Sequence, residues 1–139
     1  MFSELLWPDT HYLTGFRERF RGVTGVRELT PLSAFWFPRC QTVHTFGLRF
    51  PIDVVALDAH ARVIAIKRML EPNRVYWQPR AQTLIEVCAL CPYPLESWID
   101  LQFQLERRQN EKNRWAIRII VDGVREHSTV PSVRSVPAR

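Results

Sequence analysis

Short runs of β-branched and aromatic residues, repeatedly interrupted by proline, constrain the fold of this chain more than any other feature. Ten prolines among 139 residues leave little room for long helices. Runs of this composition are typical of strands. They lie at residues 35–37, 42–46, 52–57, 62–67, 83–87 and 115–121. We therefore expect a mainly β protein of the α+β class: a compact, antiparallel, barrel-like sheet with one or two short helices.

The length and composition indicate one domain. With 139 residues, 46% of them hydrophobic, the chain can bury a single core without disulfides or a structural metal. Residues 1–122 carry the apolar runs and form the expected globular domain. Residues 123–139 combine Ser, Pro, Val and Arg without an apolar period, which predicts a disordered C-terminal tail.

Local signals refine this expectation at four places. Leu13, Phe16 and Phe20 recur at helical spacing and predict an amphipathic helix over residues 10–21. Asp58 begins a short polar turn, so residues 52–57 and 62–67 are expected to pair as an antiparallel hairpin. Further expectations are an ordered excursion at residues 71–80, a helical turn followed by a strand within 95–105, and pairing of that strand with 115–121.

Several classes of protein are excluded or disfavoured. Apolar runs reach only about five residues, far short of the roughly 18 that span a membrane. The first residues lack a basic, apolar leader, and three cysteines do not suggest a disulfide scaffold, so we expect a cytoplasmic protein with reduced thiols. The net charge of +5 comes from scattered arginines, which argues against nucleic acid as the partner.

One segment resembles a known family. Residues 40–58, CQTVHTFGLRFPIDVVALD, are similar to the signature of domain of unknown function 192, and residues 16–25 and 84–87 fit flanking parts of the same pattern. The resemblance covers about residues 16–105. Leu48 stands where the family usually has Met, and Ala56 where it has Phe. The resemblance implies a compact, mostly antiparallel β fold with small helices, and it implies no established activity.

The HTF and RFPID letters of this segment supply candidate site residues. On a strand, His44 and Phe46 point to one face while Val43 and Thr45 point to the other. His44 is either a hydrogen-bonded structural group or a proton carrier. Arg49 and Asp53 either form an ion pair across the Pro51 bend or bind an anionic ligand, with Asp53 orienting Arg49.

Two further groups have a functional and a structural interpretation. Tyr76 and Trp77, beside Arg74 and Arg80, form either a stacking platform for a ligand or a cover over the core. The spacing of Cys88 and Cys91 is found in zinc knuckles and redox pairs, and also in buried inert thiols, which we favour. We therefore expect no metal; weak candidate ligands are Cys40, His44, Cys88 and Cys91.

The sequence favours a binding or accessory module over an enzyme, and it implies no cofactor. A small anionic ligand or a protein partner would contact a surface formed by His44, Arg49, Asp53, Tyr76 and Trp77. One alternative is an enzyme in which His44 is the acid or base and Arg49 holds an anionic substrate. Another is nucleic-acid binding through arginines and exposed aromatic side chains.

Overall fold

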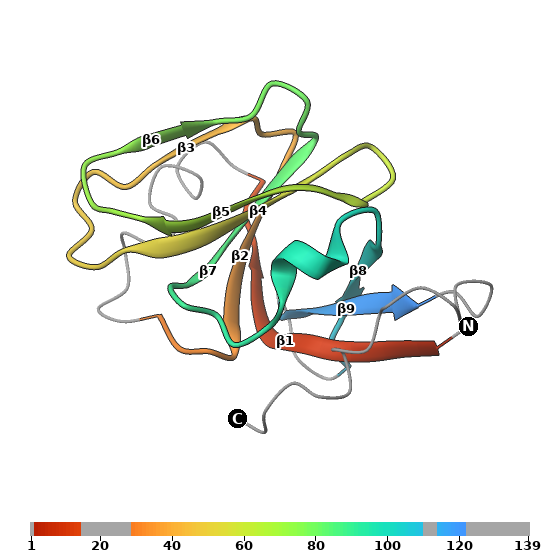
Figure 1. The fold of residues 1–139 in the computed structure, drawn as a ribbon. Coiled ribbons are helices and arrows are strands. Elements are labelled where there is room, and N and C mark those ends of the chain that lie inside the picture. The colour runs from red at the N-terminus through yellow and green to blue at the C-terminus, as the bar shows by residue number, and fades with distance from the viewer. Residues whose placement is uncertain (1, 15–28, 110–113, 122–139) are drawn as a thin grey trace.

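A computed structural model of the chain describes residues 2–14, 29–109 and 114–121 (Figure 1). These residues form nine strands and a four-residue 3-10 helix, and they contain no α-helix. Within the same ranges, no helix is long and apolar enough to cross a membrane. The elements are β1 (Phe2–Tyr12), β2 (Ser33–Pro38), β3 (Thr42–His44), β4 (Ile52–Leu57), β5 (Val63–Leu70), β6 (Val75–Trp77), β7 (Thr83–Cys88), η2 (Leu95–Trp98), β8 (Gln102–Arg107) and β9 (Trp115–Val121).

The strands form two sheets. Seven of them make one sheet in the order β5-β4-β7-β2-β1-β9-β8, and β3 pairs with β6 in a separate two-stranded sheet. All described strand pairs are antiparallel except β1 with β2, which run parallel. The expectation of a mainly β fold is confirmed, whereas the expectation of a wholly antiparallel sheet is wrong.

The large sheet curls until its two edges touch. Arg62, just before β5, forms an isolated antiparallel bridge with Gln102 at the start of β8. The Val63 amide donates to the Leu101 carbonyl over 2.9 Å, and the Phe103 amide donates to the Ala61 carbonyl over 2.8 Å. Since the contact is limited to this corner, the described sheet is strongly curved but is not a closed barrel.

The central strands are buried on both faces. Every residue of β2 and β4 is buried, so neither face of the sheet is open at its middle. Val55 and Leu57 belong to a first core cluster, which is built around the side chains of Trp7, Trp98 and Phe103. On the other face lies the second core cluster, formed by Phe35, Phe37, Val43, Leu48, Ile52, Val54, Ala56, Leu70, Ala81 and Leu84.

The two-stranded sheet covers the second core cluster. Val43 of β3 is a member of this cluster, and Tyr76 of β6 packs against it. Figure 1 shows β3 and β6 together at one rim of the molecule, away from η2 and β8. The cover therefore leaves one face of β3 and β6 directed outward.

The helix predicted over residues 10–21 is wrong in its first part. Residues 10–12 belong to β1, which pairs with both β2 and β9; residues 15–21 lie outside the described residues, as does the predicted tail at 123–139. Register shifts in the β1–β9 pairing on both sides of Trp7 accommodate Pro8 within the strand. Pairing with distant strands overrides the helical spacing here.

Several local expectations are confirmed. Residues 52–57 are β4 as predicted, and β4 pairs with β5 through the expected antiparallel hairpin. The Asp58 carboxylate accepts hydrogen bonds from the amides of His60 and Arg62 in the connecting turn. Within 95–105 a helical turn, η2, precedes β8, and β8 pairs with β9.

Candidate functional site

The pairing of β3 with β6 decides which side chains face outward. Thr42 lies opposite Trp77, Val43 opposite Tyr76, and His44 opposite Val75. Directly opposed residues of antiparallel strands present their side chains on the same face, and successive residues alternate. Trp77 and His44 are therefore on the outward face, whereas Val43 and Tyr76 are on the face that covers the core.

Thr45 anchors this small sheet to the rest of the molecule. Its side chain is fully buried, and its hydroxyl donates to the Glu71 carbonyl over 2.5 Å and accepts from the Arg74 amide over 2.9 Å. The chain turns sharply after Thr45: Leu48 donates its amide back to the Thr45 carbonyl, and Gly47 has a φ of +87°. In the HTF segment, His44 and Phe46 therefore flank Thr45, which is buried and has a structural role.

The outward face carries exposed aromatic and apolar side chains. The exposed fractions are 65% for Trp77, 55% for Val75 and 51% for Phe46. The half-buried His44 ring stacks on Phe46 with centroids 5.1 Å apart. We call the outward side chains of Thr42, His44, Phe46, Val75 and Trp77 the β3–β6 surface.

A hydrogen bond orients the His44 ring. The Phe46 amide donates to His44 Nδ1 over 3.3 Å. Since Nδ1 accepts, the neutral ring in this arrangement carries its proton on Nε2. The prediction that His44 and Phe46 share a face is confirmed.

A shallow cleft adjoins the β3–β6 surface. Its volume is about 530 Å³, and it is shared between the β2–β3 connection and the segment that leads into β7. Thr42 belongs to both the cleft and the β3–β6 surface, because its cross-strand partner is Trp77. The lining residues are Arg39, Cys40, Gln41, Thr42, Ala81 and Gln82.

The surroundings of this surface are basic. Segments 39–50 and 71–82, which contain the surface and the cleft, carry four arginines and one carboxylate, that of Glu71. Arg49, Arg74 and Arg80 are exposed. None of these three forms an ion pair with a carboxylate in the described ranges. The site therefore offers positive charge that no carboxylate of the described residues neutralises by an ion pair.

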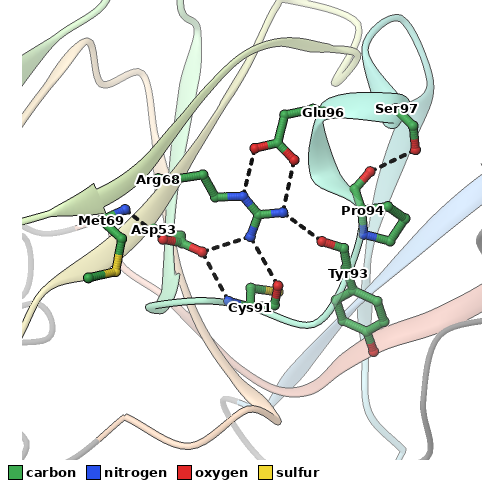
Figure 2. Close-up of polar contacts among 8 residues, drawn as sticks. All are labelled: Asp53, Arg68, Met69, Cys91, Tyr93, Pro94, Glu96 and Ser97. Carbon is green, nitrogen blue, oxygen red and sulfur yellow. Dashed lines mark hydrogen bonds and ion pairs between the residues drawn. The ribbon is translucent and has the colours of Figure 1, made fainter.

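Asp53 does not belong to this surface and does not bind Arg49. It is fully buried on β4, and its carboxylate accepts hydrogen bonds from Arg68 Nη1 and the Met69 amide, both over 2.8 Å, and from the Cys91 amide over 3.0 Å (Figure 2). The predicted Arg49–Asp53 corner is therefore wrong. The bulge where Arg68 and Met69 both lie opposite Asp53 brings the distant arginine to this carboxylate.

Arg68 joins three segments through all five of its donors. Besides Asp53, its guanidinium donates to the carbonyls of Cys91 and Tyr93 and makes two bonds to the Glu96 carboxylate, over 2.7 and 2.9 Å (Figure 2). The hydrogen bonds to Glu96 raise the pKa of Arg68 above its ordinary value, and the same bonds lower the pKa of Glu96. The cluster holds residues 91–96 against β4 and β5 and leaves no guanidinium donor for a ligand.

The structure separates the candidate zinc ligands. Cys91 packs in the first core cluster, whereas Cys40 packs against the second, on the other side of the sheet. Burial raises the pKa of the half-buried Cys88 thiol, which favours the protonated form over a reactive thiolate. In residues 2–14, 29–109 and 114–121, no group of three or more His, Cys, Asp or Glu side chains is placed to hold a metal ion.

Sequence reasoning found some of this site and missed the rest. It grouped His44, Arg49 and Trp77. His44 and Trp77 both lie on the outward face of the β3–β6 sheet, and Arg49 is exposed in the segment that follows β3. It also joined Tyr76 to Trp77, but Tyr76 faces the core. The missed signal is strand alternation, which separates these two neighbours. Arg68 and Glu96 carry no motif, and only the fold reveals their contact.

Comparison with known proteins agrees with this architecture. One solved structure, of a protein of unknown function from Novosphingobium aromaticivorans, has 16% identity and a TM-score of 0.55, covering 63% of this chain and 67% of its own. Another, from Sinorhizobium meliloti and named a candidate transcription regulator, has 14% identity and a TM-score of 0.53, covering 58% and 67%. At these identities the likeness shows a shared fold alone. No curated protein matches the sequence.

The family resemblance seen in residues 40–58 is confirmed by a profile match that covers more than half of the chain. The family profile of DUF192, described as uncharacterized ACR, matches residues 7–90. The match includes β2 to β7, and thereby both strands of the β3–β6 sheet. The chain belongs to the DUF192 family.

Proposed function

We propose that this domain is a binding module whose β3–β6 surface takes a small anionic ligand with a flat apolar group. The observation that carries the proposal is the 65% exposure of Trp77 on an outward face, in a part of the chain that is rich in arginine. Arg49, Arg74 and Arg80 of segments 39–50 and 71–82 are exposed, and none of them forms an ion pair with a carboxylate among the described residues. The ligand's apolar group stacks on Trp77. Its anionic group is held by guanidinium groups, which favour carboxylates and phosphates through paired hydrogen bonds.

His44 and Trp77 are close enough to contact the same ligand. Diagonal neighbours across an antiparallel pair lie about 7–8 Å apart, within the reach of aromatic side chains. His44 and Trp77 are such neighbours, because their cross-strand partners are Val75 and Thr42. Exposed aromatic side chains cost free energy in water and contribute strongly when a ligand covers them. This supports a binding role over a cover for the core.

The adjoining cleft supports the same proposal. Sites for small ligands are concave and usually enclose about 300–1,000 Å³. The cleft of about 530 Å³ is within that range and offers the side-chain amides of Gln41 and Gln82. In this proposal Arg39, which lines the cleft, and the exposed Arg49 supply positive charge. Asp53 and Tyr76 do not contact a ligand, because Asp53 is buried and Tyr76 faces inward.

Calorimetric titration with a matched pair of probes tests the proposal. Naphthalenesulfonate carries a flat ring and an anion, and a neutral naphthalene alcohol lacks only the charge. We expect the sulfonate to bind more tightly than the alcohol, with an advantage that shrinks as salt rises from about 0.05 to about 0.5 M. Equal affinity for the two probes, or no binding of either, contradicts the proposal.

Substitutions locate the binding. Trp77→Ala is expected to weaken sulfonate binding at least about tenfold, which corresponds to about 1.4 kcal/mol of binding free energy. Arg74→Gln is expected to remove part of the charge-dependent advantage. Leu32→Ala and Arg62→Gln are the matched controls, since both side chains are exposed but lie outside the site. If Trp77→Ala binds as well as Leu32→Ala, the β3–β6 surface is not the site.

A further inference from the structure

Hydrogen bonds at both ends of β6 fix the direction of its backbone groups. The Thr45 amide donates to the Arg74 carbonyl over 2.9 Å, and the Gln78 amide donates to the Gln41 carbonyl over 2.8 Å. In an antiparallel pair, residues that bond their partner alternate with residues that do not. Residue Tyr76, halfway between these two positions, is therefore bonded to β3, and the residues on each side of it are not.

The other edge of β6 is open. The backbone N–H and C=O groups of Val75 and Trp77 point away from β3, and no described residue of the chain bonds them. Figure 1 shows β6 at the outer rim of the molecule. An open edge with unpaired backbone groups is a template for another strand.

The side chains of this edge lack the usual protection against strand addition. Natural edge strands are commonly kept very short, or are blocked by lysine, proline or an inward-pointing charge. β6 consists of Val75, Tyr76 and Trp77, with neither a charge nor a proline. The two residues whose backbone is unpaired are also the exposed ones, at 55% and 65%. Their side chains can contact alternate side chains of an added strand.

The charge around the edge selects the chemistry of an added strand. Arg74 precedes β6 directly and Arg80 follows it by three residues, and both are exposed without a carboxylate partner in the described ranges. Across segments 39–50 and 71–82, Glu71 is the single acidic residue against four arginines. Complementary charge therefore favours an acidic segment over a neutral or basic one.

We propose that the open edge of β6 binds an extended acidic peptide, which adds as a third strand to the β3–β6 sheet. This inference rests on the proposed function, since it names a peptide as the anionic ligand of the same basic surface. The backbone groups of Val75 and Trp77 bond the peptide backbone, Trp77 contacts its apolar side chains, and the arginines contact its carboxylates.

Fluorescence anisotropy with labelled peptides tests the inference on the full chain. The probe is a short capped peptide of alternating glutamate and valine. Its first control has the same sequence with methylated backbone nitrogens, which removes the donors that strand addition requires. The second control replaces glutamate by lysine. We expect saturable binding of the probe and at least about tenfold weaker binding of both controls, as expected when strand pairing and charge both contribute.

Two variants at Val75 distinguish binding through the backbone edge of β6 from binding through the side chains of the β3–β6 surface. Val75→Pro removes one outward N–H while keeping Trp77, and proline is compatible with an edge strand whose N–H faces solvent. It is expected to weaken probe binding to the level of the methylated peptide, whereas Val75→Thr, which keeps the N–H and nearly the same side-chain volume, should weaken it much less. Thermal melting checks that Val75→Pro is folded; if it is not, the methylated peptide gives the same test on the unchanged chain.

The outcomes are distinct from those of the proposed function. If naphthalenesulfonate binds in a Trp77-dependent manner but the acidic peptide does not bind, strand addition is refuted and the binding module stands. If the methylated peptide binds as tightly as the probe, the peptide is held without strand addition and the inference is overturned. If neither the sulfonate nor the peptide binds, both proposals fail.

Discussion

At the scale of single residues, the cluster around Arg68 shows how a buried charge is accommodated. Asp53 is fully buried, yet its carboxylate accepts three hydrogen bonds, one of them from the guanidinium of Arg68. A buried ion is tolerated when it is paired and its remaining lone pairs are bonded. Because all five donors of Arg68 are also used, the cluster stabilises the fold and does not offer a site.

Replacing Asp53 measures this stabilisation. Asp53→Ala leaves Arg68 without its buried partner and two backbone amides without an acceptor. We expect the free energy of unfolding in urea to fall by about 2–4 kcal/mol, because two backbone amides lose their acceptor, while Arg68 keeps its bonds to Glu96. Asp58→Ala is the control, since that carboxylate bonds only an exposed turn. A loss below about 1 kcal/mol would show that the cluster contributes little.

Glu96 makes the stability of the cluster depend on pH. Its hydrogen bonds to Arg68 lower its pKa below the ordinary value of 4.5. The ionised carboxylate therefore stabilises the folded state above that value, and the contribution is lost as the pH falls through the lowered pKa. Glu96→Gln should destabilise the protein by about 0.5–1 kcal/mol near neutral pH, because the side chain is mostly exposed.

The decisive comparison is between two pH values. Urea unfolding of the unchanged protein and of Glu96→Gln should differ more at about pH 7 than at about pH 3, because protonation of Glu96 as the pH falls removes its charge. A difference of the same size at both pH values would mean that the lost contact is not electrostatic.

At the scale of elements, Thr45 decides whether β3 and β6 form a stable outward face. Its hydroxyl bridges the Glu71 carbonyl and the Arg74 amide, which lie in the turn between β5 and β6. A sheet of two three-residue strands has few hydrogen bonds of its own and is marginal when isolated. The buried threonine and the packing of Val43 and Tyr76 on the second core cluster supply the missing stability.

Thr45→Val tests this role with little change in side-chain volume. The substitution leaves a carbonyl and an amide without a partner, so we expect a loss of about 1–3 kcal/mol. Hydrogen exchange should quicken at the amides of β3 and β6 before it does so in β4. Thr42→Val is the matched control, since Thr42 is exposed and lies on the outward face of β3. Equal stability of the two variants would remove Thr45 from this role.

At the scale of the whole molecule, sequence patterns predicted the elements better than their assembly. Strands at 52–57 and 83–87 follow from continuous β-branched and apolar residues, which are typical of strands buried on both faces. β1 was missed because Pro8 and the irregular apolar order give no alternation, and its pairing with two distant strands determines its structure. The parallel β1–β2 pair likewise has no local signal.

For the candidate site too, local features could be predicted from the sequence, whereas contacts between distant residues could not. The HTF pattern predicted that His44 and Phe46 share a face, and their rings stack, although β3 ends at His44 and Phe46 lies in the turn that follows. The partner of Asp53 was not predictable, since Arg68 lies 15 residues away and reaches the carboxylate through a bulge. Trp77 was identified by composition, but its exposure depends on the register of β6 against β3.

Our central proposal is that the outward face of β3 and β6 binds anions. The most direct measurement is an NMR titration of isotope-labelled protein with naphthalenesulfonate. If the anion binds at this face, the chemical shifts of the amides of residues 39–49 and 71–82 change saturably, and those around η2 and β9 change little. Shifts centred on η2 or β9, or no saturable shift anywhere in the chain, would contradict it.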